Sequence, residues 1–276
     1  MIPTGTKALN IGTPVNRGAA LNRGLVNWWF AVPNWKGLQF RDLCGRNHGT
    51  LTSGPTWQGT RGRLGGLGAV SLATATSQSV NLGIGVVDFG TADFTFTAQF
   101  YCPTIGNGRT VFHKGTAGTT EMLVEIANPV VDRVVVARVG SSPVTTVNGT
   151  TIIVANVWYH VAVVRTGGNV YLYINGKLDA STADGGGTMT SARASYIGAA
   201  SYGNQLGGLI DDISFRTAGL SSDGVSSLYR EAIQGYQNTL NWYRPLRVDV
   251  PAAAGGGGSE LLPKMMQYGL YVSSGV

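Results

Sequence analysis

Two consecutive β-hairpins in residues 158–179 constrain the fold more than any other feature of the chain. Three short runs rich in β-branched and aromatic residues follow one another there: Tyr159–Arg165, Asn169–Ile174 and Lys177–Asp179. Gly167-Gly168 separates the first two runs, and Asn175-Gly176 supplies the positive-φ pair of a type I′ turn before the third. Three strands joined by tight turns predict an antiparallel meander.

The same period-two pattern recurs outside this meander. In Asp93–Phe100, the residues Phe94, Phe96, Ala98 and Phe100 fall on one face, as a half-buried strand requires. Further runs of strand length are Ser79–Leu82, Glu121–Ile126, Arg133–Val139, Thr150–Val154, Ala194–Gly198 and Gly207–Phe215. With 41 glycines in 276 residues, short strands and tight turns dominate the chain.

One helix interrupts the strands near the C-terminus. Ser221 or Ser222 can cap it, and Gly235 stands where a C′ glycine belongs. Its apolar residues follow helical spacing at Val225, Leu228, Tyr229 and Ala232. We therefore predict an all-β, two-sheet antiparallel jelly-roll sandwich with one short C-terminal helix and extended terminal arms.

Composition divides the chain into four parts. Residues 1–65 form a basic, loop-rich arm that we expect to pack partly on the sandwich, and 66–235 form the jelly roll. Residues 236–251 are an extension, and 252–276 are a Gly-rich linker and an apolar peptide. Met1 to Gly66 holds eight basic residues and one acid, so we expect this part to face an acidic partner. The residues that we expect to dock partners are Arg17, Arg23, Leu261, Leu262, Met265, Met266, Tyr268 and Tyr271.

Several classes of protein are disfavoured by the sequence. Cys44 and Cys102 are too few for a disulfide framework or a structural zinc site, and we expect two buried free thiols. The sequence has no run of Lys or Arg and no nucleic-acid-binding motif, so we do not expect specific nucleic-acid binding. No secretory signal and no apolar run of 18 residues is found, so we expect neither export by that route nor contact with a membrane.

The motifs of the central region resemble those of laminin-G-like jelly rolls, which are concanavalin A-like lectin/glucanase domains. Trp158–Val163 followed by Val170–Lys177 resembles the W-x-H-V-A and L-Y-V-N-G hairpin of that family. The other matching segments are Asp93–Pro103, Val111–Gly115, Tyr196–Gly198, Gly208–Phe215 and Leu220-Ser221. The resemblance covers roughly residues 66 to 235, and it implies the fold without specifying a ligand.

Family members that cleave glycans carry paired carboxylates on one strand. Here Glu121 and Glu125 share a strand face, but four steps of about 3.3 Å place them roughly 13 Å apart. This exceeds the window of roughly 5 to 9.5 Å for an acid and base acting on one glycosidic bond. We therefore expect no enzyme and no catalytic residues, and we expect both acids to lie on a solvated strand face.

Binding sites are the remaining candidates. Because laminin-G-like domains often bind calcium at a sandwich rim, Asp211 and Asp212 are candidate metal ligands. The alternative is that these carboxylates bond nearby backbone amides; no other cofactor is expected. Trp35 and Trp57 are candidate sugar-stacking residues in the loop-rich arm, whereas His160 is expected to be structural.

Three functions follow: a subunit of a large assembly, a glycan-binding lectin or adhesin, and a glycan hydrolase. The opening segments Leu21–Trp29 and Asp42–Leu51 resemble the beginnings of proteins from phages and environmental bacteria. We favour a non-enzymatic bacteriophage capsid decoration (cement) or accessory virion protein, made in the host cytoplasm and located on the virion. Its expected partners are other virion or coat subunits in a homo-oligomer. A cell-surface glycan, bound with or without calcium, is the alternative partner, and a hydrolase is the least favoured function.

Overall fold

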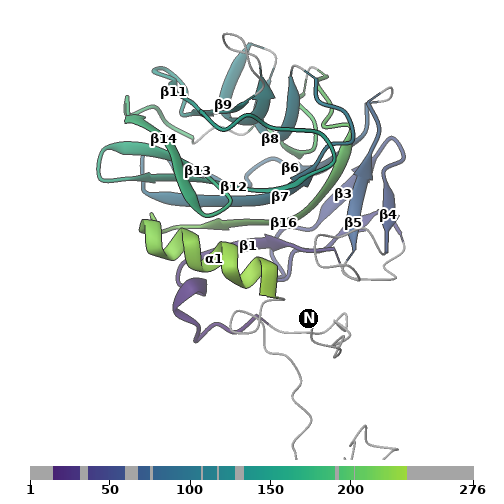
Figure 1. The fold of residues 1–276 in the computed structure, drawn as a ribbon, viewed down its shortest axis with the longest axis horizontal. Helices are drawn as coiled ribbons and strands as arrows, with labels where there is room; N and C mark the ends of the chain where they lie inside the picture. The colour runs from purple at the N-terminus through teal and green to yellow at the C-terminus, as the bar shows by residue number, and fades with distance from the viewer. Residues whose placement is uncertain are drawn as a thin grey trace, which may run out of the picture.

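The computed structural model shows two stacked β-sheets with a helix beneath one of them (Figure 1). It describes residues 15–31, 37–59, 68–74, 77–106, 108–116, 118–127, 134–189, 193–201 and 203–234. The strands are antiparallel throughout the two sheets. The prediction of an all-β, two-sheet jelly-roll sandwich is confirmed.

The first sheet contains eight strands and lies next to the helix. Seven of them have the order β14-β13-β12-β7-β16-β5-β4, and β1 pairs with the remaining length of β16. Their bounds are β1 Leu25–Trp29, β4 Thr56–Gln58, β5 Ala69–Leu72, β7 Phe94–Tyr101, β12 Trp158–Thr166, β13 Asn169–Ile174, β14 Lys177–Ala183 and β16 Gly208–Arg216. The predicted meander is therefore β12, β13 and β14, with Asn175 and Gly176 at φ of 51° and 76° in the second turn.

The second sheet also has eight strands, in the order β11-β10-β9-β8-β15-β6-β3-β2. Their bounds are β2 Gln39–Phe40, β3 Gly49–Thr52, β6 Ser79–Gly83, β8 Arg109–Thr116, β9 Thr119–Ala127, β10 Val134–Val139, β11 Thr145–Asn148 and β15 Ser195–Ile197. Neighbours in this order are often far apart in sequence, because the chain passes repeatedly between the sheets.

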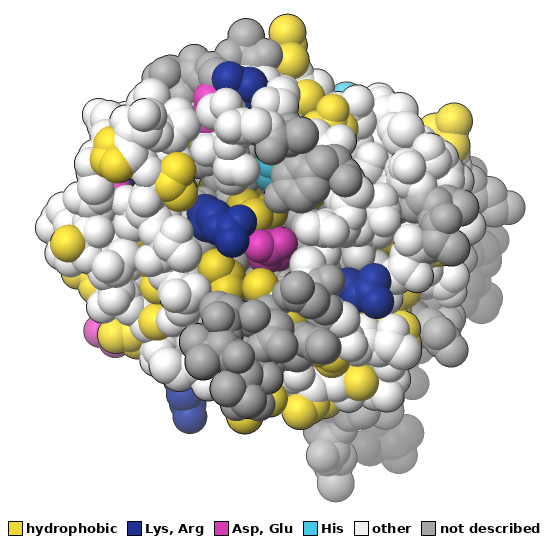
Figure 2. All heavy atoms as spheres, turned by 90° about the horizontal axis from the view of Figure 1, so that it is seen from above, with side chains coloured by type: hydrophobic (Ala, Val, Ile, Leu, Met, Phe, Trp, Pro, Cys, Tyr) yellow, Lys and Arg dark blue, Asp and Glu magenta, His cyan; other side chains and the backbone are white. Residues whose placement is uncertain are grey.

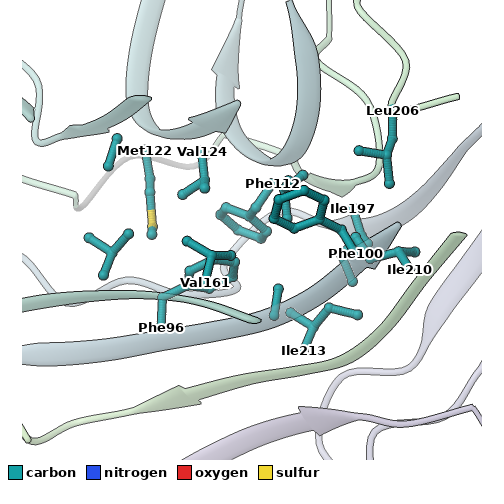
Figure 3. Packing of buried hydrophobic residues seen from close by; sticks show 14 of the residues in the cluster. Phe96, Phe100, Phe112, Met122, Val124, Val161, Ile197, Leu206, Ile210 and Ile213 are labelled. Carbon is teal, nitrogen blue, oxygen red and sulfur yellow. The ribbon is translucent and has the colours of Figure 1, made fainter. Parts of the chain in front are cut away.

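The core lies between the two sheets and is built from their alternating apolar side chains. Figure 3 shows Phe96, Phe100 and Val161 of the first sheet facing Phe112 and Val124 of the second. The rings of Phe96 and Phe112 lie 5.3 Å apart, and both side chains are fully buried. Burial of aromatic and aliphatic surface of this kind is the main force that holds the two layers together.

The N-terminal part of the chain is more integrated than an arm that packs partly on the sandwich. Strands β1 and β4 extend the first sheet, and β2 and β3 extend the second, so the division at residue 65 does not follow the sheets. Asp42 helps to fix this part: its carboxylate accepts hydrogen bonds from the backbone N–H of Trp28 and the side-chain amide of Asn27. Trp28 and Trp29 are buried as a result.

One predicted strand is wrong. Residues Thr150–Val154 are not a strand, and the edge strand β11 lies earlier, at Thr145–Asn148. The backbone N–H groups of Thr150 and Thr151 donate to the carboxylate of Asp179 instead of a neighbouring strand. Ile153 is buried in the core, while Ile152 and Val154 are exposed. The residues Thr150–Val154 therefore have the alternating pattern of a strand, but they form no strand because no neighbouring strand pairs with them.

The helix and the short 3-10 helix η1 (Ala20–Asn22) lie on the outer side of the first sheet. Helix α1 spans Ser222–Gln234, within a residue of the prediction. Val225 packs against Ala162 and Val164, and Ala232 packs against the cluster around Trp28. The predicted extension 236–251 and the peptide 252–276 lie outside the described residues.

Candidate functional site in the second sheet

A single row of side chains crosses all eight strands of the second sheet on its outer face. Each member is the register partner of the next: Thr146, Arg138, Leu123, His113, Tyr196, Asn81, Thr50 and Gln39. Since neighbouring strands lie about 4.8 Å apart, the row is about 34 Å long. Antiparallel pairing thus brings residues that are up to 157 positions apart, Gln39 and Tyr196, onto one line.

The residues one position further along each strand form a second row, and this second row shows that the polar row faces outward. Its members are all apolar and all belong to the core: Val147, Ala137, Val124, Phe112, Ile197, Val80 and Leu51. Because successive residues of a strand point to opposite faces, the polar row must lie on the other side of the sheet.

The outward row is only partly covered. Thr146, Thr50 and Gln39 are exposed, and Arg138, Tyr196 and Asn81 are half-buried. Figure 2 looks onto this side of the molecule and shows a basic and an acidic side chain touching near its middle, with hydrophobic side chains around them. Leu123 and His113, in the middle of the row, are fully buried. A molecule that lies across the strands would therefore meet the Thr146 hydroxyl and the Arg138 guanidinium on one side of them, and phenol, amide and hydroxyl groups on the other.

Glu125 and Arg138 form an ion pair beside this row. Glu125 is on β9, on the same face as Leu123, and its Oε1 lies 3.4 Å from a terminal nitrogen of Arg138. The carboxylate side chain is 7% exposed, whereas the guanidinium side chain is 39% exposed. Burial raises the pKa of the Glu125 carboxyl, and the charge of Arg138 opposes the rise.

His113 is the most deeply buried polar member of the row. The backbone N–H of Ser201 donates to its Nδ1 at 3.3 Å, so that loop covers part of the imidazole. Burial lowers the pKa of His113 to about 4, because the charged form would lose its hydration. The imidazole is consequently neutral near pH 7.

A second group of charges lies at the end of β8 and β9. The ammonium of Lys114 is buried, donates to Asp88 Oδ1 at 2.6 Å and to the carbonyl of Val86 at 2.9 Å, and lies 3.9 Å from Glu121. Arg193 approaches the other oxygen of Glu121 at 3.7 Å. Glu121 and Glu125 are thus buried beside cations, and the expectation that they lie on a solvated face is wrong.

Asp211 and Asp212, the candidate metal ligands, are buried in the first sheet at a bulge between β16 and β7. Asp211 Oδ1 accepts from the backbone N–H of Ala31, and Asp212 accepts from the indole of Trp28 and the amide of Gln99. These contacts correspond to the structural alternative. No group of three metal-ligating side chains occurs among the residues that the structure describes.

The other predicted site residues are dispersed. Trp57 is half-buried on β4, its ring packs edge-on against Phe40 at 5.6 Å, and its indole N–H donates to the carbonyl of Gly37. Arg17 and Arg23 are exposed beside η1 and do not belong to the row. Trp35 and the C-terminal residues Leu261, Leu262, Met265, Met266, Tyr268 and Tyr271 lie outside the described residues.

Two further expectations can be compared with the structure. Cys44 and Cys102 are both free thiols; Cys102 is buried and Cys44 is half-buried. His160 is buried and its ring meets that of Tyr229 edge-on, as expected of a structural residue. Within the described ranges, no helix is long and apolar enough to cross a bilayer.

The outward row was missed by sequence reasoning because its members share no motif. Apart from Leu123, each is an ordinary polar or aromatic residue in an alternating strand, and only the register between strands aligns them. The alternation of Glu121, Leu123 and Glu125 with core residues was the one available signal, and it placed these three on one face.

Two stacked antiparallel sheets with this strand order form a lectin- and glucanase-like β sandwich. The chain belongs to the concanavalin A-like lectin/glucanases superfamily, since the laminin-G model of that superfamily matches residues 74–226. This confirms the family that the hairpin motifs indicated. No curated protein sequence matches the chain.

Solved structures share the fold at low sequence identity. Domain 4 of AbnA, an extracellular arabinanase of Geobacillus stearothermophilus solved with arabinotriose, is 18% identical with a TM-score of 0.58; the match covers 74% of this chain and 98% of that domain. The binding domain of Paraclostridial Mosquitocidal Protein 1 is 14% identical with a TM-score of 0.60, covering 76% and 52%. A sialidase of Trypanosoma rangeli in complex with the inhibitor DANA is 15% identical with a TM-score of 0.55, covering 80% of this chain but 36% of the sialidase.

Proposed function

We propose that this protein is a non-enzymatic glycan-binding module and that the outward row of the second sheet is its binding surface. The observation that carries the proposal is the alignment of accessible polar and aromatic side chains on one face of the second sheet: Thr146 and Arg138 lie on one side of the buried Leu123 and His113, and Tyr196, Asn81, Thr50 and Gln39 lie on the other. Similarity to a domain solved with arabinotriose supports it. The ligand class is a linear oligosaccharide that lies across the strands.

The chemistry of the row suits a sugar chain. Tyr196 offers a half-buried ring for the apolar face of a sugar, and its phenol offers a hydrogen bond. Asn81 uses its Oδ1 to accept from the backbone N–H of Gly83, and its amide N–H groups have no partner within the described part of the chain. Thr50 and Thr146 add exposed hydroxyl groups that can both donate and accept.

The arrangement of carboxylates supports binding without cleavage. Glu121 and Glu125 are buried, and each lies beside a cation. Their separation of about 13 Å along β9 remains outside the roughly 5 to 9.5 Å of a hydrolytic pair. We expect no release of reducing ends from any polysaccharide that the protein binds.

A glycan array probed with the full chain tests the proposal, followed by calorimetry on the best ligand. Tyr196→Ala should weaken binding at least tenfold. Tyr171→Ala is the matched control, because Tyr171 is a half-buried tyrosine on β13 of the other sheet. An array without signal, or equal losses in the two variants, would contradict the proposal.

A second candidate function is attachment to a large assembly, as a capsid decoration or accessory protein of a bacteriophage virion. Three large apolar side chains within six residues support a protein partner: Ile152, Val154 and Val157 are 53%, 50% and 41% exposed. Exposed Arg17 and Arg23 offer charge to an acidic surface. In this case the protein is a homo-oligomer or contacts coat subunits.

Co-sedimentation with purified phage particles tests the second candidate. The full chain should pellet with particles, and deletion of residues 252–276 should reduce the bound fraction if the apolar peptide anchors it. Ile152→Ser with Val154→Ser tests the exposed apolar segment in the same assay. Failure of the full chain to pellet would contradict attachment, whatever the array shows.

A further inference from the structure

The outer face of the second sheet presents its cations and buries its carboxylates. In the two arginine ion pairs of this region, the exposed fractions of the side chains are 39% for Arg138 and 32% for Arg193, against 7% for Glu125 and 2% for Glu121. The ion pair at the end of β8 has the opposite arrangement, since Lys114 is fully buried and Asp88 is 36% exposed. A ligand that approaches the two arginines therefore meets guanidinium groups before it meets carboxylates. This sign is opposite to that expected for a cation-binding face.

Arg138 differs from Arg165 and Arg216 in the hydrogen bonds that its guanidinium makes. Arg165 donates to Asp184 at 2.7 Å and to the carbonyl of Gly90, and Arg216 donates to the carbonyl of Leu21 and the hydroxyl of Ser214. Both of these residues are buried, and they tie parts of the fold together. The guanidinium of Arg138 has the 3.4 Å ion pair with Glu125 and makes no side-chain hydrogen bond to any residue in the described ranges.

Glu125 fixes where this guanidinium lies without occupying its donors. A partly desolvated carboxylate 3.4 Å away restrains the side chain, which reduces the entropy lost when a ligand binds. The remaining N–H groups form a planar fork that matches a carboxylate or a sulfate with two parallel hydrogen bonds. Tyr196 and Asn81 lie three and four strands away in the same row, beyond the buried Leu123 and His113, and can hold sugars further along the glycan chain.

We propose that the ligand of the outward row is an acidic glycan and that Arg138 binds its carboxylate or sulfate group. The inference rests on the proposed glycan-binding function and narrows it from oligosaccharides in general to those that carry an oxyanion. Arg138 lies between Thr146 and Leu123 in the row, so the charged sugar binds toward the β11 edge of the sheet.

The experiment compares acidic and neutral forms of the same backbone by calorimetry on the full chain. Oligogalacturonides are paired with their methyl esters, and dextran sulfate is paired with dextran. We expect the charged member of one pair to bind at least tenfold more tightly than its neutral partner. Which pair shows the difference distinguishes a carboxylate from a sulfate. The affinity for the charged member should fall with added NaCl.

Variants then assign the effect to one side chain. Arg138→Ala should remove the preference for the charged member, and Arg138→Lys should restore only part of it, because an ammonium keeps the charge but not the fork. Arg230→Ala is the control, since Arg230 is an exposed arginine on α1, at the other sheet. It should leave both affinities unchanged.

The two proposals fail differently. Binding of neutral glycans with equal affinity for charged and uncharged members overturns the role of Arg138 and leaves the glycan-binding function intact. No binding of any glycan overturns the function itself. A preference for acidic glycans that Arg138→Ala and Arg230→Ala reduce equally would show general charge attraction and would also overturn the inference.

Discussion

The indole N–H of Trp28 donates to Oδ1 of Asp212 at 2.6 Å and joins two residues that are 184 positions apart. The other oxygen of Asp212 accepts from the amide of Gln99 at 2.8 Å. All three side chains are buried, so the carboxylate connects β1, β16 and β7 on the helix side of the first sheet. Both carboxylate oxygens of Asp212 are therefore used in hydrogen bonds that stabilise the fold.

Asp212→Ala should lower the free energy of unfolding by about 2 to 4 kcal/mol, because two buried donors lose their acceptor. Asp223→Ala, at an exposed position in the first turn of α1, should cost less than about 1 kcal/mol. Urea denaturation followed by tryptophan fluorescence measures both. If Asp211 and Asp212 are structural residues and not metal ligands, calcium should not stabilise the native protein. A rise in Tm with added calcium would contradict this structural role of Asp211 and Asp212.

Two turn glycines provide a matched test of the meander. Gly176 has φ of 76°, and a Cβ there would lie 2.9 Å from the Cβ of Tyr229 on α1. Gly167 has φ of 57°, and a Cβ there would meet no atom within 4 Å. Gly167→Ala should cost about 1 to 2 kcal/mol, the strain of a left-handed residue. Gly176→Ala should cost at least about 1 kcal/mol more, because the helix must also move. Equal losses in thermal unfolding would show that the helix does not press on this turn.

His113 should make stability depend on pH. Its folded pKa is about 4, and that of an unfolded histidine is about 6.5. Between these values the unfolded chain binds a proton that the native protein does not. The free energy of unfolding contributed by His113 is therefore complete above about pH 6.5 and falls as the pH drops to 4, by up to about 3 kcal/mol.

Urea denaturation of the wild type and of His113→Gln at several pH values between 7 and 4 measures this effect. The variant should lose stability less steeply over that window, because it lacks the group that gains a proton on unfolding. The same slope in both proteins would show that His113 is protonated at its usual pKa in the native state.

Both thiols should be unreactive in the native protein. Burial raises the pKa of Cys102 to about 12 and, with the charge of Asp42, that of Cys44 to about 11. Because the thiolate is the nucleophile, an aromatic disulfide reagent at pH 8 should label the native protein slowly and the urea-unfolded protein at once. Cys44→Ala and Cys102→Ala assign each phase. Rapid labelling of the native wild type would contradict the raised pKa values of the two thiols.

Local features of the fold were predictable from sequence, and non-local ones were not. The Asn175-Gly176 turn and the helix at Ser222–Gln234 depend on residues a few positions apart, so their patterns predict them directly. Thr150–Val154 has the composition of a strand, but the carboxylate of Asp179 takes its backbone donors. A strand needs a partner, and composition does not contain that information.

The site shows the same limit. Glu121, Leu123 and Glu125 share a face by alternation alone, which the sequence contains. The pairing of Tyr196 with His113 on one side and Asn81 on the other depends on the order of strands in the sheet. Asp211 and Asp212 were candidate ligands because of their acidity, while their buried donors, among them Trp28, come from a distant strand.

The pairing of β1 with β16 has a consequence for how the protein is made. Leu25 to Trp29 leaves the ribosome almost two hundred residues before its partner Ile213 to Arg216. Until then Trp28 and Trp29 lack the strand that buries them. The nascent chain therefore exposes an aromatic, aggregation-prone segment during most of its synthesis. Closure of the first sheet is thus a late event, governed by slow long-range pairing, and chaperones have time to act before it.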